Sequence, residues 1–322
     1  MNRRRFVALI GGALAAPVLR AQQPGKIYRV GFLGVTSRPL AARLYGAFEQ
    51  GLRDQGYTIG KDLVVEYRLA DGKIERLPDL ARELVAANVD VIVVGTNPNI
   101  VAAKAATQRI PIVFAVGTDV IGQGFVKSLA RPGGNITGLT WDVGGGTISK
   151  SIELLKEIAP RISRLAVLYE HPYHNYYREP VEDAVARLRL NLIWIDSSDD
   201  FERGFAEAMR EHANAAYALG GPRMFTRRAE LVALAAKYRL PAMYVNTEFV
   251  DAGGLMAYAP DVSASFHDAA RYVDKILKGA KPADLPVQQP TKIDFVINQR
   301  TANSLGLTIP QSILLRADRV IE

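Results

Sequence analysis

Cysteine is missing from the 322 residues of this chain, and histidine occurs only four times. A chain without thiols forms no disulfide bond, no thiolate metal site, no cysteine nucleophile and no lipid-bearing N-terminal cysteine. His171 and His174 stand three residues apart, but a metal ion needs further ligands within reach. A polar aromatic loop is the simpler interpretation of this segment, HPYHNYY. The sequence therefore predicts neither a metal site nor a bound cofactor.

Long hydrophobic runs are also missing, except near the N-terminus. Phe6 to Val18 form an apolar run of thirteen residues, whereas about 20 are needed to span a bilayer. Arg3 to Arg5 precede this run, and the small residue Ala21 follows it. That order is typical of a secretory signal peptide and resembles a twin-arginine signal. We expect cleavage after about Ala21, which removes residues 1–21 and leaves a periplasmic protein; a retained membrane anchor is the alternative.

The positive charge is modest once that segment is removed. The full chain carries 40 Lys and Arg against 33 Asp and Glu, a formal net charge of +7. Cleavage would remove four of the 40 basic residues and leave 36, for a net charge of +3. The sequence contains no stripe of Lys and Arg with interleaved aromatic residues. It therefore predicts no binding to nucleic acid.

Short apolar runs alternate with amphipathic helical patterns along the first half of the chain. Strands are predicted at residues 28–35, 62–70, 89–95, 110–117 and 136–143. Helices are predicted at 40–56 and 77–85, between the third and fourth strands, and in a segment that ends in the Pro-Gly-Gly turn of FVKSLARPGGN, residues 125–135. Such alternation favours a parallel sheet with helices on both faces.

The second half begins the same alternation again. Strands are predicted at 164–170, 191–196, 215–221, 240–248 and 253–260, with helices between them. A further helix at 262–279 and a Pro-rich segment then lead to one more strand, which ends at Asn298. The sequence thus predicts an α/β protein with two Rossmann-like lobes joined by a hinge of three crossing strands. We expect residues 26–140 plus 260–285 in the N-terminal lobe and 141–259 plus 286–322 in the C-terminal lobe.

Two successive strands end in nearly the same polar tip, Gly95-Thr96-Asn97 and Gly117-Thr118-Asp119. In parallel α/β sheets, ligands bind beyond the carboxyl ends of the strands, where helix N-termini present free N–H groups. Asn97, which precedes a proline, and Asp119 are also suited to cap helices, so a purely structural role is the alternative for each tip. Several polar tips from two lobes together favour a shared cleft.

Three motifs suggest catalysis, and each has a simpler interpretation. Asp119 and Glu248 invite a role as a general acid and base, although nothing in the sequence sets their separation. Residues 144–151, GGGTISKS, nearly match a phosphate-binding loop, but Ser149 replaces the second required glycine. A flexible connection before a helix explains these glycines better. The segment VGFLG is only a fragment of a dinucleotide fingerprint. We therefore expect no enzyme.

The sequence resembles the ABC-transporter substrate-binding proteins of the tryptophan/tyrosine-type group along almost the whole mature chain. The most specific likeness is the stretch IPIVFAVGTDVIGQGFVKSLARPGGNITGLT. Further segments are GLRDQGYTIGKDLVVEYR, LARELVAANVDVIVVG, IELLKEIAP, YVDKILKGAKPADLPVQQPTKIDFVIN and TANSLGLTIPQSILLRADRVI. The resemblance implies a type I periplasmic-binding-protein fold, whose two lobes close around a small molecule and present it to a membrane permease.

By the same resemblance, the ligand site would draw on residues of both lobes and of the crossings between them. They are Thr36, Ser37, Thr96, Asn97, Thr118, Asp119, Trp141, His171, Asn175, Gly221, Asn246, Glu248 and Tyr258. Two tips of the second lobe depart from the common pattern, at Gly220 to Arg223 and at Asn246 to Glu248. The identity of the ligand is therefore not carried over from other members.

The sequence as a whole predicts a monomeric solute-binding component of an ABC importer. It would capture a small polar or aromatic, amino-acid-like metabolite by closure of the lobes, with the permease as its partner at the inner membrane. Asp119 or Glu248 would bind an ammonium or hydroxyl group, helix N-termini a carboxylate, and Trp141 or Tyr258 the apolar part. The alternatives are a ligand-sensing effector domain for a receptor or regulator and a hydrolase with a carboxylate pair.

Overall fold

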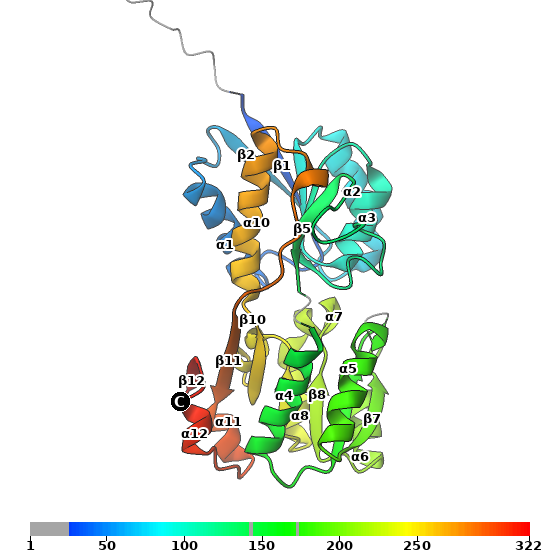
Figure 1. Cartoon of the computed structure of the whole chain (residues 1–322), viewed down its shortest axis with the longest axis vertical. Helices are drawn as coiled ribbons and strands as arrows, with labels where there is room; N and C mark the ends of the chain where they lie inside the picture. The colour runs from blue at the N-terminus through cyan, green and yellow to red at the C-terminus, as the bar shows by residue number, and fades with distance from the viewer. Residues whose placement is uncertain (1–25, 142–143, 172–173) are drawn as a thin grey trace, which may run out of the picture.

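Two β-sheets, each covered by helices, form two lobes one above the other in the computed structural model (Figure 1). The structure describes residues 26–141, 144–171 and 174–322. The predicted signal peptide therefore lies outside the described residues. Within the described residues, no helix is long and apolar enough to cross a membrane.

The first lobe contains a parallel sheet of five strands in the order β2-β1-β3-β4-β5. The strands are β1 (Tyr28–Gly34), β2 (Leu63–Leu69), β3 (Val91–Val94), β4 (Ile112–Gly117) and β5 (Ile136–Thr140). Its helices are α1 (Ala42–Asp54), η1 (Ile74–Arg76), α2 (Leu77–Ala86), α3 (Asn97–Ala106) and, from much later in the chain, α10 (Val262–Leu277).

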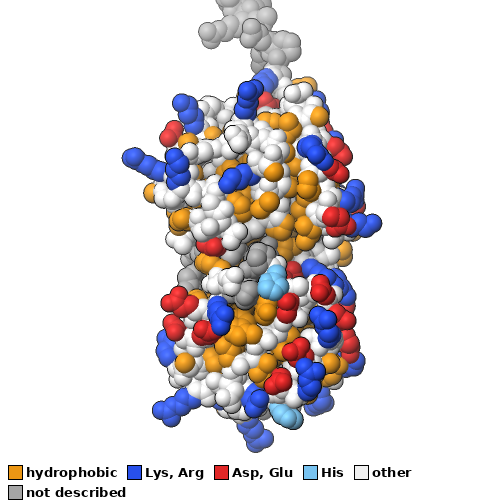
Figure 2. Space-filling model, turned by 90° about the vertical axis from the view of Figure 1, so that its right-hand side faces the viewer, with side chains coloured by type: hydrophobic (Ala, Val, Ile, Leu, Met, Phe, Trp, Pro, Cys, Tyr) orange, Lys and Arg blue, Asp and Glu red, His pale blue; other side chains and the backbone are white. Residues whose placement is uncertain are grey.

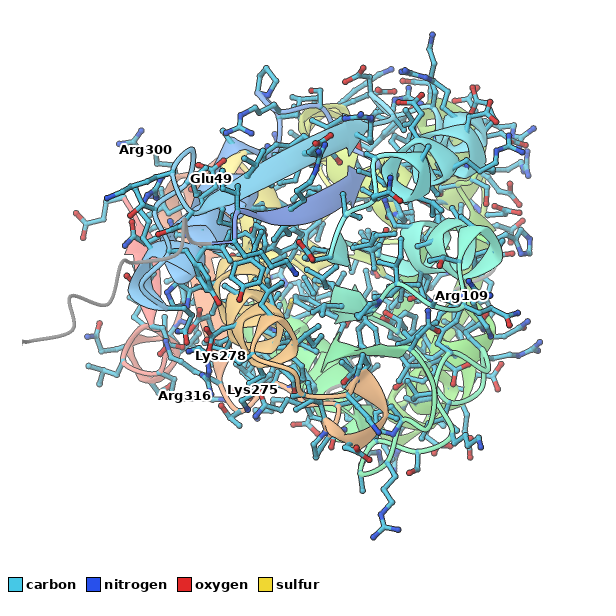
Figure 3. The ribbon with its side chains drawn as sticks, turned by 90° about the horizontal axis from the view of Figure 1, so that it is seen from above. Glu49, Arg109, Lys275, Lys278, Arg300 and Arg316 are labelled. Atoms are coloured by element: carbon cyan, nitrogen blue, oxygen red, sulfur yellow. The ribbon has the colours of Figure 1, made fainter. Side chains whose placement is uncertain are left out.

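Strand β3 shows why helices cover both faces of this sheet. All four residues of β3 are buried, and successive side chains point to opposite faces. Val91 and Val93 pack into the core formed with α1 and α10, whereas Ile92 and Val94 pack into the core formed with α2 and α3. In the view from above, Lys275 of α10 and Lys278, which directly follows this helix, lie on one side of the lobe, and Arg109, which follows α3, lies on the other (Figure 3).

The second lobe contains a sheet of seven strands in the order β12-β11-β10-β9-β8-β6-β7. The strands are β6 (Arg164–Tyr169), β7 (Asn191–Asp196), β8 (Ala215–Ala218), β9 (Ala242–Tyr244), β10 (Met256–Pro260), β11 (Ile293–Asn298) and β12 (Arg319–Ile321). Strand β11 runs antiparallel to β10, and the other pairings are parallel. The predicted α/β class with two mainly parallel sheets is confirmed.

Eight helices and one 3₁₀ turn belong to the second half of the described chain besides α10. They are α4 (Gly144–Ile158), α5 (His174–Arg187), α6 (Phe201–Arg210), α7 (Pro222–Thr226), α8 (Arg228–Lys237), α9 (Thr247–Asp251), η2 (Pro282–Asp284), α11 (Gln299–Ser304) and α12 (Gln311–Leu314). Side chains of α4 and α5 pack on one face of the second sheet, and those of α6, α8 and α9 on the other.

The chain passes between the two sheets after β5, after β10 and before β11 (Figure 1). The last two passages arise because α10 packs against α1 of the first lobe, although its neighbours β10 and β11 belong to the second sheet. The segment before β11 also lies against β5: the N–H of Thr140 donates to the carbonyl of Gln288 at 2.9 Å. The passages are therefore joined to one another at the waist of the molecule.

The predicted helix that ends in FVKSLARPGGN is wrong. The structure has turns and bends rather than a helix from Val120 to Asn135. Gly124 and Gly133 have positive φ angles of 65° and 75°, and a helix does not continue through such residues. Phe125 and Val126 are nevertheless buried in the core beside α2 and α3, which explains the apolar pattern without a helix.

Candidate functional site

A pocket lies between the lobes, at the carboxyl ends of strands from both sheets. It contains about 890 Å³ of atom-free space, open solvent at its mouth included. The first lobe and its crossing provide Phe32, Gly34, Val35, Thr36, Ala41, Leu44, Tyr45, Gly95, Thr96, Asn97, Asn99, Val116, Thr118, Trp141, Val262 and Phe266. The second lobe provides Tyr177, Leu219, Gly220, Gly221, Pro222, Phe225, Val245 and Asn246.

Aromatic side chains form much of the pocket wall. Phe32 and Tyr45 meet edge to face with ring centroids 5.0 Å apart, and Phe32 stacks on Phe266 at 6.1 Å. The Tyr45 hydroxyl donates to the carbonyl of Thr36 at 2.7 Å, so this polar atom already has a partner. Burial raises the pKa of Tyr45, and its phenol stays neutral at physiological pH. Trp141 packs into the same hydrophobic core as Phe32, Tyr45 and Phe266, so the pocket wall is continuous with the interior of the first lobe.

The two similar tips noted in the sequence are joined to each other in the structure. The Asn97 side chain donates to the carbonyl of Thr118 at 2.8 Å, and the N–H of Thr118 donates back to the Asn97 side chain at 2.9 Å. Thr96, not Asn97, is the N-cap of α3, in a capping box with Asn99. Asn97 is free to bridge to the next strand because it occupies the first helical position.

The second-lobe wall is a tight turn supported from behind by Glu170. Gly220 and Gly221 have φ angles of 75° and 145°, and Pro222 then begins α7. The Glu170 carboxylate accepts hydrogen bonds from the N–H groups of Arg223, at 3.3 Å, and Met224. Burial raises the pKa of Glu170 to about 7, and the two backbone donors oppose that rise. Our sequence reasoning missed Glu170; its position at the end of β6 was the available signal.

Direct contacts join the two lobes beside the pocket. The hydroxyl oxygens of Thr36 and Thr226 are 3.3 Å apart, and the Arg228 guanidinium donates to the carbonyl of Leu40 at 3.4 Å. Arg43 of α1 also lies 3.7 Å from Asp251 of α9. Thr226 and Arg228 belong to α7 and α8, so this corner of the second lobe touches the first lobe.

Seven of the residues predicted for the ligand site line the pocket. They are Thr36, Thr96, Asn97, Thr118, Trp141, Gly221 and Asn246. The structure therefore brings together predicted residues from several separate strand ends, as expected for parallel sheets.

Six other predicted residues are not among those that line it: Ser37, Asp119, His171, Asn175, Glu248 and Tyr258. Asp119 has a φ of 50°, and its carboxylate accepts from the N–H of Gly122 at 3.2 Å within its own turn. His171 pairs with Asp196 at 3.1 Å. The Tyr258 ring packs edge to face on Phe295, with centroids 6.1 Å apart.

Glu248 is buried in the second lobe and is only 8% exposed. Neither of its carboxylate oxygens has a hydrogen-bond partner in another described residue. Burial raises the pKa of Glu248, while the positive charge of Arg43 lowers it. A carboxylate pair of Asp119 and Glu248 facing the pocket, as a hydrolase would need, does not occur in this structure.

Two further features of the described residues are the placement of metal-ligating side chains and the distribution of charge. Within residues 26–141, 144–171 and 174–322, no group of three or more His, Asp or Glu side chains is placed to hold a metal ion. Figure 2 shows positive and negative side chains interspersed over one face of both lobes. What the site offers chemically is an aromatic enclosure with hydroxyl and amide groups at strand ends, which suits binding of a small molecule.

Comparison with known proteins agrees with this description. A family described as ABC transporter substrate binding protein matches residues 29–321. The chain is 22% identical to a tyrosine-binding protein of Clostridioides difficile, over 86% of this chain and 81% of that protein.

Solved structures show the same architecture. A conserved domain protein from Vibrio cholerae is 29% identical with a TM-score of 0.85, covering 92% of this chain and 100% of that one. An ABC domain from Streptococcus pneumoniae, solved in complex with L-Trp, is 25% identical with a TM-score of 0.83, covering 91% and 99%. Because the family match spans nearly all of the described residues, the chain belongs to the ABC transporter substrate-binding proteins.

Proposed function

We propose that the mature chain is a periplasmic protein that captures a small aromatic, amino-acid-like metabolite and delivers it, as a monomer and without catalysis, to an ABC permease. The observation that carries this proposal is the pocket between the lobes, with aromatic walls and hydroxyl and amide groups at the strand ends. The tyrosine-binding relative and the L-Trp complex support the choice of ligand class. The predicted signal peptide supports export.

The proposed mechanism is closure of the lobes around the ligand. A ligand that touches both lobes stabilises the closed arrangement only by as much as it binds that arrangement more tightly than the open one. Trp141 and Phe225, from opposite sides of the waist, would enclose an aromatic ring, while Thr96, Thr118 and Asn246 would meet its polar groups. The division into lobes at residues 26–140 plus 260–285 and 141–259 plus 286–322 is part of this proposal.

The test is a thermal-shift screen of the chain from Gln22 against amino acids, aromatic acids, sugars, nucleosides and dicarboxylates. A ligand at one hundred times its dissociation constant should add about 2.7 kcal/mol of stability, which raises the melting temperature clearly. We expect that rise with aromatic amino acids or closely related aromatic acids. A rise confined to sugars or dicarboxylates would contradict the proposed ligand class, and product formed during the incubation would contradict the absence of catalysis.

The two tryptophans of the chain provide a matched pair of variants. Trp141 lines the pocket, whereas Trp194 lies on β7 beside Tyr169, with ring centroids 5.8 Å apart. We expect Trp141→Phe to weaken binding of the screened ligand about tenfold, because part of the ring contact is lost. Trp194→Phe should leave the affinity unchanged. Equal effects of the two substitutions would argue that the ligand binds elsewhere.

A further inference from the structure

Glu170 is a buried carboxylate directly behind the second-lobe wall of the pocket. It follows β6 and is only 6% exposed. Its oxygens accept hydrogen bonds from the N–H groups of Arg223 and Met224, the second and third residues of α7. The first residue of α7 is Pro222, which has no N–H group to satisfy. Glu170 thus takes up the first-turn donors of α7 that would otherwise lack partners.

The wall residue in front of Glu170 is a glycine for a steric reason. A Cβ at Gly221 would lie 2.5 Å from an oxygen of Glu170, and the φ of 145° also excludes other residues. Gly221, Pro222 and Phe225 all line the pocket. One side of this segment therefore faces the ligand space, while its other side rests on the Glu170 carboxylate.

The same short helix touches the first lobe. Its last residue, Thr226, has its hydroxyl oxygen 3.3 Å from that of Thr36, which also lines the pocket. The Arg223 side chain points the other way and donates to the carbonyl of Ser198 at 2.5 Å, which ties α7 to the end of β7. A displacement of α7 would therefore alter both the pocket wall and the contact between the lobes.

We propose that Glu170 is a positioning residue for the ligand pocket: its carboxylate holds α7 where Phe225 completes the pocket wall and Thr226 meets the first lobe. This inference rests on the proposed function only where it concerns ligand binding, because the ligand class is taken from that proposal. Glu170 acts through backbone hydrogen bonds and does not line the pocket itself. A neutral glutamine of the same shape would turn one acceptor into a donor that faces a backbone donor, so it cannot replace Glu170.

The first experiment uses hydrogen–deuterium exchange of the ligand-free mature chain, so it needs no identified ligand. Glu170→Gln should make the amides of residues 221–227 exchange about tenfold faster or more, because charge-assisted hydrogen bonds are lost. The matched control is Glu182→Gln, which removes an exposed carboxylate on α5 that pairs with Arg178 at 2.8 Å. Unchanged exchange at 221–227, or equally faster exchange throughout the second lobe, would overturn the proposal.

A second measurement works on the wild-type chain and covers the case in which Glu170→Gln does not fold. Burial raises the pKa of Glu170 to about 7, so the buried carboxyl binds a proton more readily than one that water reaches after α7 has moved away. By linkage, protonation below neutral pH favours the closed position of α7. Protection of residues 221–227, corrected for intrinsic exchange rates, should therefore rise as the pH drops from 8.5 to 5.5 and stay level in α3. The charge of Arg223 on α7 lowers the pKa of Glu170, and His171, the next residue along the chain, pairs with Asp196 of β7. His171→Gln should keep the same midpoint; loss of the transition would assign it to His171 and overturn the proposal.

The binding arm uses L-tryptophan as the probe, measured by calorimetry at pH 8. We expect Glu170→Gln to weaken its binding about tenfold, and Glu182→Gln to leave it unchanged. If wild-type protein does not bind L-tryptophan, this amino acid is not the ligand, while the exchange experiment still decides the role of Glu170. If L-tryptophan binds the Glu170→Gln variant as tightly as wild type, the positioning role in ligand binding is overturned.

Discussion

Replacement of Asn97 by alanine tests whether the two strand tips act as one unit. In the folded chain, the Asn97 side chain forms two hydrogen bonds with the backbone of Thr118, at 2.8 and 2.9 Å. Alanine removes both and leaves the carbonyl and N–H of Thr118 without these partners. Because Thr96, Asn97 and Thr118 all line the pocket, the loss should affect both stability and ligand binding.

The expected magnitude follows from these two bonds. A typical intramolecular hydrogen bond contributes about 0.5–1.5 kcal/mol net, so the pair contributes about 1–3 kcal/mol. Asn97 is only partly buried, and water can reach the freed groups, which favours the lower half of that range. Alanine is a better helix former than asparagine, which offsets the loss by at most about 0.7 kcal/mol. We therefore expect Asn97→Ala to lower the free energy of unfolding by about 1 kcal/mol.

Urea denaturation followed by tryptophan fluorescence and circular dichroism measures this change, since Trp141 lines the same pocket. Asn303→Ala is the control: Asn303 is an exposed residue of α11, and the effect there should stay within about 0.5 kcal/mol. The affinity for the ligand found in the thermal-shift screen should also fall in Asn97→Ala alone. A stability and an affinity that both match wild type would refute the view that this bridge shapes the pocket.

Three further substitutions test the packing and the buried charge. Gly51→Ala should lower the stability by about 1–3 kcal/mol in urea denaturation, because its Cβ would lie 2.3 Å from the carbonyl oxygen of His267 on α10. Gly46→Ala in the same helix, with nothing within 4 Å of the added Cβ, should instead raise it by about 0.5–1 kcal/mol; the reverse order would contradict the α1–α10 contact. Burial raises the pKa of Glu248 from 4.5, so its stabilising contribution is complete below about pH 4.5 and is lost as the pH rises through the folded-state pKa. Glu248→Gln should flatten that dependence and stabilise the protein at pH 8 by about 1 kcal/mol, and an unchanged pH profile would refute the assignment.

The architecture could be predicted to a large extent because it depends on local patterns. The run from Val91 to Val94 is apolar at every position, which identifies a strand covered on both faces. In α1, Leu44, Phe48, Gly51 and Leu52 recur at helical spacing, and the structure buries all four. The wrong helix before Asn135 shows the limit of this reasoning. A buried apolar pair in a glycine-containing turn produces the same short pattern.

The candidate site was predictable only in part. Sequence alone placed polar residues at the ends of parallel strands, and the order of strands then brings Thr96, Asn97 and Thr118 together. The direction of each side chain depends on backbone angles and on neighbours distant in sequence. Asp119 turns back on its own loop because its φ is positive.

The sequence by itself determined the two α/β lobes and the edge of each sheet at which the pocket lies, because period-two and helical apolar patterns are local properties. Only the tertiary structure decided which acids reach that edge. Glu170 and Glu248 both follow buried strands, yet one supports the wall of the pocket and the other is enclosed in the second lobe. The physical reason is that the position of a buried carboxylate depends on the hydrogen-bond donors around it. For Glu170 these donors are N–H groups of α7, which begin 53 residues further along the chain at Arg223.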